Sequence, residues 1–346
     1  MHTTDTPTFV PRVVPSLEDL LHGAVVVRLP MRVRFRGIDE REAVLLHGPA
    51  GWAEFAPFAE YDDAESAAWL AAAVDAGWSE PPPPLRAAVP VNATVPAVRP
   101  EEVAGVLARF PGCTTAKVKV AAGGSLADDV ARVAQVRRLL GPTGRIRVDA
   151  NGGWDVETAL EALTALAVHD LEYAEQPCRT VPELADLRSR LARAGIGVRI
   201  AADESIRRAE DPFAVARAGA ADVAVLKVAP LGGVHRLLAV AEVLERRHGL
   251  PVVVSSALDT AVGIAAGVAA AAALPRLELA CGLGTGGLLA DDVADLAVRD
   301  GSLPVQPVEP DPERLARLAA DPATRDRWLD RVARCHRLLR TGGSGT

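Results

Sequence analysis

The sequence has very few lysines. Of the 38 basic residues in the 346-residue chain, only Lys117, Lys119 and Lys227 are lysine, and all the others are arginine. The three lie in short β-branched runs, TAKVKV and VAVLKV, which are typical of buried strands. Arginine keeps its proton in proteins, whereas burial can lower the pKa of a lysine toward neutrality. The distribution therefore predicts lysines kept for proton transfer. The alternative is strand-end lysines whose aliphatic stems pack on apolar surface.

Other absences exclude whole classes of protein. The chain has no C-x-x-C pair, and its four cysteines are far apart, so neither a zinc knuckle nor a disulfide framework is expected. The longest apolar stretch, residues 260–275, is too short to span a bilayer, and the N-terminus lacks a secretory signal. We therefore expect a cytoplasmic protein with no membrane partner. The net charge of -7 argues against nucleic acid as a partner.

The first part of the chain has the pattern of a small α+β unit. Residues 23–57 alternate between apolar and polar side chains in three stretches separated by turn residues, which predicts antiparallel strands. Asp62 and Glu65 have the spacing of a capping box ahead of an alanine-rich stretch, so a helix is expected over residues 64–76. We expect this N-terminal capping domain to span residues 1–86.

Beyond it, short apolar runs alternate regularly with amphipathic helical stretches. Eight such runs begin 25 to 30 residues apart, at 89–95, 115–120, 145–150, 171–176, 198–205, 223–228, 252–257 and 277–282. Repeated β–α units build a parallel sheet, and this many in succession close into a barrel. We therefore predict an α/β fold with a (β/α)7β TIM-like barrel over residues 87–287. Residues 288–346 are expected to form a C-terminal helical segment that completes the cap, with a disordered end.

The C-terminal ends of the barrel strands carry charged residues in a fixed order. Such barrels place their chemistry at these ends. The second strand ends in Lys117 and Lys119, the next three end in carboxylates (Asp149; Glu175; Asp203 or Glu204), and the sixth ends in Lys227. Three carboxylates aimed at one point repel each other unless a cation lies there, and hard oxygen ligands suit Mg²⁺. One such carboxylate could be a helix cap, but five charged strand ends in succession have no common structural explanation.

The second and sixth strands lie on opposite sides of a ring of eight. Lys119 and Lys227 would therefore flank a substrate held by the cation. That arrangement suits removal of the proton next to a carboxylate, because the cation stabilises the enediolate and one lysine takes the proton. We expect mutual repulsion and the cation to lower the pKa of both lysines, and Arg147 to act in the same direction.

These motifs resemble a known family. The segments GWAEFAPFAEYDD, TAKVKV, RVDANGGW, EYAEQPC, AADES, LKVAPLGG and GLGTGGLLADDV are similar to those of the enolase superfamily, in its muconate-lactonizing branch, and within it to the o-succinylbenzoate synthases. The resemblance covers the cap and the whole barrel. The use of a lysine base with Mg²⁺ in this superfamily is a documented pattern.

The resemblance implies a lyase of menaquinone biosynthesis. Its reaction would be the dehydration of 2-succinyl-6-hydroxy-2,4-cyclohexadiene-1-carboxylate to 2-succinylbenzoate through a metal-stabilised enediolate. It implies that Asp149, Glu175 and Asp203 bind Mg²⁺, that Lys119 transfers the proton, and that Lys227 stabilises the enediolate from the opposite face. The alternatives are an N-succinylamino acid racemase or dipeptide epimerase on the same scaffold, and a barrel that only binds a ligand.

Several further residues are candidates to bind the small carboxylate substrate. They are Lys117, Asn151, Ser255, Ser256, Gly282 and Gly284. The glycine-rich stretch 282–287 suggests a tight turn whose N–H groups meet a carboxylate, with a purely structural turn as the alternative. In the cap, the arginines of the stretch 31–36 and the aromatic residues Phe55, Phe58 and Tyr61 could close over the barrel, or form a solvated strand face and a minor core.

Overall fold

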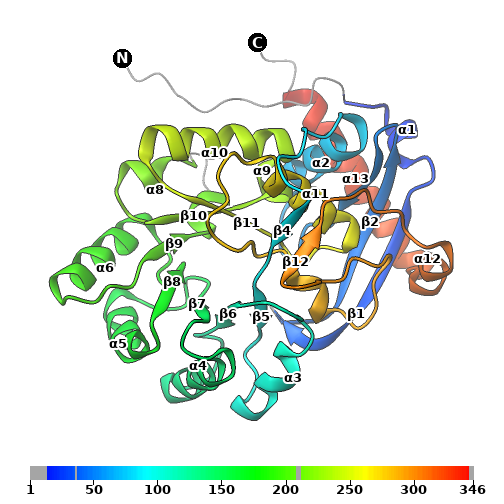
Figure 1. The fold of residues 1–346 in the computed structure, drawn as a ribbon. Helices are drawn as coiled ribbons and strands as arrows, with labels where there is room; N and C mark the ends of the chain where they lie inside the picture. The colour runs from blue at the N-terminus through cyan, green and yellow to red at the C-terminus, as the bar shows by residue number, and fades with distance from the viewer. Residues whose placement is uncertain (1–13, 36, 208–211, 343–346) are drawn as a thin grey trace, which may run out of the picture.

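A computed structural model describes residues 14–35, 37–207 and 212–342 (Figure 1). A barrel surrounded by helices carries a cap of antiparallel strands and helices on one side. The N-terminal stretch before residue 14 and the glycine-rich C-terminus after residue 342, which was expected to be disordered, lie outside the described residues.

The cap is built on a three-stranded antiparallel sheet in the order β1-β2-β3. Its elements are α1 (Leu17–Leu21), β1 (Val25–Phe35), β2 (Ile38–Gly48), β3 (Gly51–Phe55) and α2 (Asp63–Trp78). The predicted helix cap is confirmed, because the carboxylate of Asp62 accepts a hydrogen bond of 2.8 Å from the backbone N–H of Glu65. Trp69 and Leu70 of α2 are buried against the sheet.

The barrel sheet is parallel and has the order β11-β10-β9-β8-β7-β6-β5. Its strands are β5 (Ala93–Val95), β6 (Thr115–Lys119), β7 (Arg145–Asp149), β8 (Leu171–Glu175), β9 (Ile200–Ala202), β10 (Val223–Lys227) and β11 (Val252–Ser255). The helices between and after them are η1 (Pro100–Glu102), α3 (Val103–Leu107), α4 (Leu126–Leu140), α5 (Val156–Leu166), η2 (Ala167–His169), α6 (Val181–Arg193), α7 (Glu204–Arg207), α8 (Ala214–Arg217), α9 (Val228–Leu231), α10 (Val234–His248) and α11 (Ala261–Ala273). The parallel barrel predicted from the repeated units is confirmed.

The last strand position is filled by isolated bridges. Cys281 pairs with Val91, and Gly282 pairs with Ser255, so the segment predicted as an eighth strand links β11 back to the start of the sheet. The first predicted strand is also divided, because β4 (Ala88–Pro90) pairs outside the barrel with β12 (Ser302–Pro304). A small apolar layer fills the barrel interior below the strand ends: Tyr173, Ala201, Val223, Val225, Val253 and Leu279.

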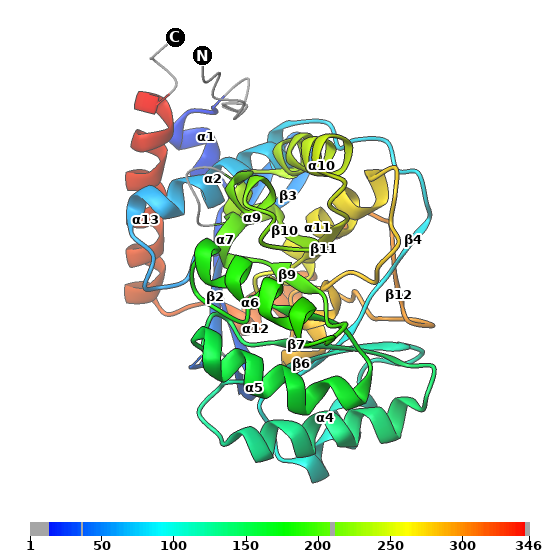
Figure 2. The ribbon, with the colours of Figure 1, turned by 90° about the vertical axis from the view of Figure 1, so that its left-hand side faces the viewer.

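The C-terminal segment returns to the cap. After η3 (Gly284–Leu288) and β12 come α12 (Pro312–Leu318) and α13 (Pro322–Gly342), which lie within the segment expected to be helical. Helix α13 runs beside α2 (Figure 2). Its buried Arg331 donates to the carbonyls of Phe58 and Tyr61, so the end of the chain fixes the aromatic loop of the cap.

All four cysteines are free in the described part of the chain. Within the described ranges, no helix is both long enough and apolar enough to cross a membrane.

Candidate active site

A small cavity of about 40 Å³ lies at the C-terminal ends of the barrel strands. Lys119 on β6 and Lys227 on β10 both line it. In the sheet order, β10 is separated from β6 by β9, β8 and β7, so the two lysines approach from opposite sides of the barrel mouth.

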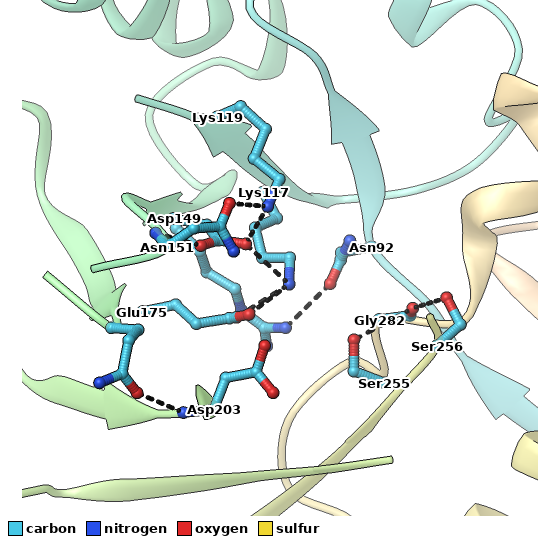
Figure 3. A network of polar contacts seen from close by, with 12 residues as sticks. Asn92, Lys117, Lys119, Asp149, Asn151, Glu175, Asp203, Ser255, Ser256 and Gly282 are labelled. Atoms are coloured by element: carbon cyan, nitrogen blue, oxygen red, sulfur yellow. Dashed lines mark hydrogen bonds and ion pairs between the residues drawn. The ribbon is translucent and has the colours of Figure 1, made fainter. Parts of the chain in front are cut away.

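Lys119 is held by two acceptors from the neighbouring strand end. Its ammonium lies 2.5 Å from Oδ2 of Asp149 and 2.6 Å from Oδ1 of Asn151 (Figure 3). Burial lowers the pKa of Lys119, and repulsion from Lys117 acts in the same direction, although Asp149 opposes both. The expected decrease is therefore found, but its main cause is burial.

Lys117 is bound by both oxygens of one carboxylate. Its ammonium donates to both carboxylate oxygens of Glu175 at 2.8 Å and lies 3.6 Å from Oδ2 of Asp149. Burial opposes its charge, but the two carboxylates outweigh burial and raise the pKa of Lys117. Burial also raises the pKa of Glu175 to about 7, helped by Asp149 and Asp203 and only partly offset by Lys117. Lys117 therefore stays positively charged, whereas the negative charge of Glu175 is not fully compensated by its neighbours.

The third carboxylate pairs with the third lysine. Lys227 donates to Oδ2 of Asp203 at 2.6 Å, and both side chains are nearly inaccessible to solvent. Gln176 supports this end of the sheet, because its Oε1 accepts from the backbone N–H groups of Asp203 and Ser205. Glu204, the alternative in the sequence, instead accepts from the side chain of Asn151.

Each of the three carboxylates pairs with at least one lysine in this arrangement. In the described part of the chain, no three His, Cys, Asp or Glu side chains are placed to hold one metal ion together. Asp149, Glu175 and Asp203 still lie at the ends of three neighbouring strands, β7, β8 and β9. They bring three hard oxygen donors and three negative charges into a buried site.

Arg147 does not have the expected role. Its side chain is fully buried below the site, and its Nε donates to Glu172 at 2.5 Å. Its Nη1 donates to Asn92, and its guanidinium lies 4.6 Å from the ring centre of Tyr173. Because Glu172 neutralises it, Arg147 belongs to a polar layer beneath the site.

The neutral substrate-binding candidates are divided between two places. Ser255, Ser256 and Gly282 line the cavity opposite Asp149 and Glu175 (Figure 3). A methyl group on Gly282 would lie 2.3 Å from the hydroxyl of Ser255, so any larger residue there would require that hydroxyl to move. Gly284 lies beyond them against Asn92 and Phe110 and lines a separate cavity.

The cavity also has walls that were not among the predicted substrate-binding residues: Phe35, Thr94, Ala257, Leu258 and Thr285. The ring of Phe35, at the end of β1, lies 5.2 Å from the ammonium of Lys119. Thr94 pairs with Lys117 across the sheet, and its buried hydroxyl has no partner among the described residues. Only the alternation of β5 could have indicated that Thr94 faces inward beside Lys117.

The cap aromatics have a structural role instead. Phe55, Phe58 and Tyr61 are almost completely buried in the cap core with Trp69, which agrees with the alternative of a minor core. Of the arginines expected beside them, Arg32 and Arg34 are exposed on β1, and Arg36 lies outside the described residues.

Two protein families and several named relatives match most of the chain. Residues 101–312 match the family described as enolase C-terminal domain-like, and residues 26–77 match the enolase N-terminal domain-like family. The o-succinylbenzoate synthase of Mycobacterium marinum is 59% identical over 95% of this chain and 97% of that protein. That of Mycolicibacterium smegmatis is 59% identical over 94% of this chain and 99% of that protein.

Solved structures share the fold at low identity. Muconate lactonizing enzyme from Pseudomonas fluorescens is 23% identical with a TM-score of 0.72, covering 86% of this chain and 98% of that one. An N-succinyl Arg/Lys racemase from Bacillus cereus is 18% identical with a TM-score of 0.72, covering 86% and 97%. The chain therefore belongs to the enolase superfamily and, within it, to the o-succinylbenzoate synthase family of lyases.

Proposed function

We propose that this enzyme catalyses the Mg²⁺-dependent dehydration of 2-succinyl-6-hydroxy-2,4-cyclohexadiene-1-carboxylate to 2-succinylbenzoate, a step of menaquinone biosynthesis. The observation that carries the proposal is the pair of lysines, Lys119 and Lys227, that face one cavity from opposite strands. The 59% identity to proteins named o-succinylbenzoate synthase supports the choice of substrate.

The donor set fits a divalent cation. Asp149, Glu175 and Asp203 would hold it, since they offer oxygen atoms alone, as Mg²⁺ prefers. The raised pKa of Glu175, about 7, means that the lysines leave part of its charge uncompensated, so added positive charge would stabilise the carboxylate form. When bound, Mg²⁺ would supply positive charge for the carboxylate of the substrate.

Lys119 would transfer the proton. In the neutral form its amine takes the proton from C1 of the ring, the carbon that bears the carboxylate, and the electrons of that C–H bond move toward the carboxylate. The bond from C6 to the hydroxyl group then breaks, and the same ammonium returns the proton to the departing oxygen as water. The ring becomes aromatic, so atoms and charges balance without another reactant. The lowered pKa of Lys119 favours the required neutral form.

Lys227 would act by its charge. It reaches the cavity from the far side, where an ammonium can stabilise the enediolate without exchanging a proton. Lys117, with its raised pKa, would stay charged. Asn151, Ser255, Ser256 and Gly282 would contact the polar groups of the substrate, and Gly284 would act only through the shape of its loop.

A racemase is the second candidate, and the same two lysines favour it. Exchange of a proton between two faces of a carbon needs an acid or base on each face, and Lys119 and Lys227 supply both. Dehydration needs only one proton-transferring lysine. The two functions therefore differ in what they require of Lys227.

We expect the dehydration to be faster than racemisation of N-succinylamino acids by at least about tenfold in kcat/KM, or ~1.4 kcal/mol in transition-state binding. The measurement is turnover of the cyclohexadiene substrate beside deuterium exchange at the α-carbon of N-succinylamino acids in D₂O. Slow exchange is compatible with the proposal, because both lysines are present. Exchange faster than dehydration would assign the enzyme to the racemases.

A separate prediction concerns Thr94, which we propose donates its hydroxyl to a substrate oxygen. Because the unpartnered buried hydroxyl costs free energy in the free enzyme, Thr94→Val should keep or raise the melting temperature, by up to about 2 °C. The same variant should lower kcat/KM by about tenfold, since the substrate loses a hydrogen bond. Thermal unfolding and steady-state kinetics measure the two effects.

Two control variants make this test selective. Thr94→Ser keeps the hydroxyl and should retain most of the activity. Thr115→Val changes a buried threonine at the opposite end of the neighbouring strand β6 and should leave kcat/KM unchanged. Full activity of Thr94→Val would show that the hydroxyl does not contact the substrate.

A further inference from the structure

One wall of the cavity is not part of any strand or helix. Ala257 and Leu258 line the cavity between the end of β11 and the start of α11. Leu258 has φ +66°, a left-handed conformation that a branched side chain adopts only at a cost. A backbone segment in this conformation depends on its surroundings for its shape.

The groups that hold this wall are side chains. The backbone N–H of Ala257 donates to Oδ2 of Asp259 at 3.1 Å. The carbonyl of Leu258 accepts from Nε of Arg41 at 3.1 Å, and that of Ala257 accepts from Nη2 of Arg41 at 3.5 Å. The guanidinium therefore supports both carbonyls of the wall from outside the barrel.

Arg41 comes from the cap. It lies on β2, is 3% exposed, and also donates to the carbonyl of Ala56 in the loop after β3. Its guanidinium lies 4.4 Å from the ring centre of Phe58. Ala257 and Leu258 are themselves part of the cap core rather than the barrel core. The cap and the cavity wall thus meet at one guanidinium.

Two buried carboxylates flank this junction. Glu54 accepts from the backbone N–H groups of Thr260 and Gly263, and a methyl group on Gly263 would lie 2.7 Å from Asp259 and 2.9 Å from Glu54. Burial raises the pKa of Glu54 to about 8 and raises that of Asp259, and the charge of Arg41 opposes both increases. Arg41 therefore has an electrostatic role here besides its hydrogen bonds.

We propose that Arg41 is a positioning residue for substrate binding: it fixes the Ala257–Leu258 wall in the shape that receives the substrate. The inference rests on the proposed function, since it assumes that the substrate occupies this cavity. Arg41 does not reach the reacting atoms. Lys119 is held independently by Asp149 and Asn151, so loss of the wall should weaken binding more than it slows the chemical step.

Arg41→Lys is the test, because lysine keeps the charge beside Glu54 and Asp259 but cannot span the carbonyls with a planar fork. With Mg²⁺ present, we expect the Kd of 2-succinylbenzoate and the KM of the substrate to rise by at least about tenfold, with kcat within about threefold of wild type. The Mg²⁺ affinity should not change. Calorimetry and steady-state kinetics give these values.

Arg86→Lys is the matched control. Arg86 also holds backbone carbonyls, those of Ala271, Ala272 and Leu274 at the far end of α11, but it does not line the cavity. Its variant should lose stability while keeping wild-type Kd and KM. If both variants lose stability alike and both keep wild-type affinity, Arg41 only supports the fold and the inference is wrong.

A second measurement does not depend on the folding of a variant. In wild-type enzyme with Mg²⁺, 2-succinylbenzoate should slow hydrogen exchange at the amides of residues 257–259 by at least about fivefold, because a bound ligand suppresses local opening. Product binding without protection of these amides would overturn the inference and leave the proposed function intact. Wild-type enzyme that neither binds the product nor dehydrates the cyclohexadiene substrate would refute the proposed function itself.

Discussion

Lys119→Arg is expected to lower kcat by about 10³-fold, as much as Lys119→Ala does. The loss of a positioned general base costs 10²- to 10⁴-fold in typical enzymes. Arginine keeps the positive charge and can still pair with Asp149, but its guanidinium does not give up its proton near neutral pH. The rates of substrate dehydration by wild type and both variants measure the effect, with circular dichroism as the check on folding.

Lys227 provides the matched control for this prediction. If Lys227 contributes only charge, Lys227→Arg should keep clearly more activity than Lys227→Ala, whereas the two Lys119 variants should be equally inactive. Both lysines end a barrel strand and both pair with a buried aspartate. The larger size of arginine and the burial of the site should therefore affect both Lys→Arg variants alike. Substantial activity in Lys119→Arg would show that another group takes the proton.

The fold followed from the sequence because its signals are local. The spacing of the apolar runs indicates the repeated units. The start of α2 is indicated by Asp62, which accepts a hydrogen bond from a residue only three positions later. The last barrel position differs from expectation because it depends on partners distant in sequence. Cys281 bridges to Val91 and Gly282 to Ser255, and no periodicity within the segment specifies such pairings.

The polar strand ends were predictable for a similar reason. Strand alternation places Lys117 and Lys119 on one face, and barrel topology brings Asp149, Glu175 and Lys227 to the same end. Which lysine pairs with which carboxylate could not be predicted, because the pairing depends on side-chain conformations in a buried site.

Thr94 and Arg41 were missed for a different reason. Neither belongs to a charged pattern along the chain, and each matters through a group that is remote in sequence. Arg41 meets Leu258 across 217 residues, and Thr94 faces the cavity because β5 pairs with β6. Only the folded structure shows that the Thr94 hydroxyl has no partner among the residues it describes and that the Arg41 guanidinium binds the carbonyls of the cavity wall.

The charge balance of the site leads to the last prediction. Three carboxylates and three lysines are buried together, and burial raises the pKa of Glu175 to about 7, so the lysines do not fully stabilise its carboxylate form. A divalent cation bound to these carboxylates would stabilise their charged form further. Binding should therefore be measurable in the enzyme without substrate.

We expect exhaustive chelation to abolish dehydration and Mg²⁺ to restore it. Because the unfolded chain has no such site, Mg²⁺ at 100 times its Kd should stabilise the fold by ~2.7 kcal/mol and raise the melting temperature by several degrees.

Glu175→Gln should remove both the activity and the thermal shift. Asp75→Asn is the control. Asp75 is a buried aspartate of α2 that accepts from the first backbone N–H groups of α10, so the variant should lower stability but keep the thermal shift. A metal-free protein that remains fully active, or a Glu175→Gln variant that keeps the wild-type shift, would show that these carboxylates do not hold a catalytic cation.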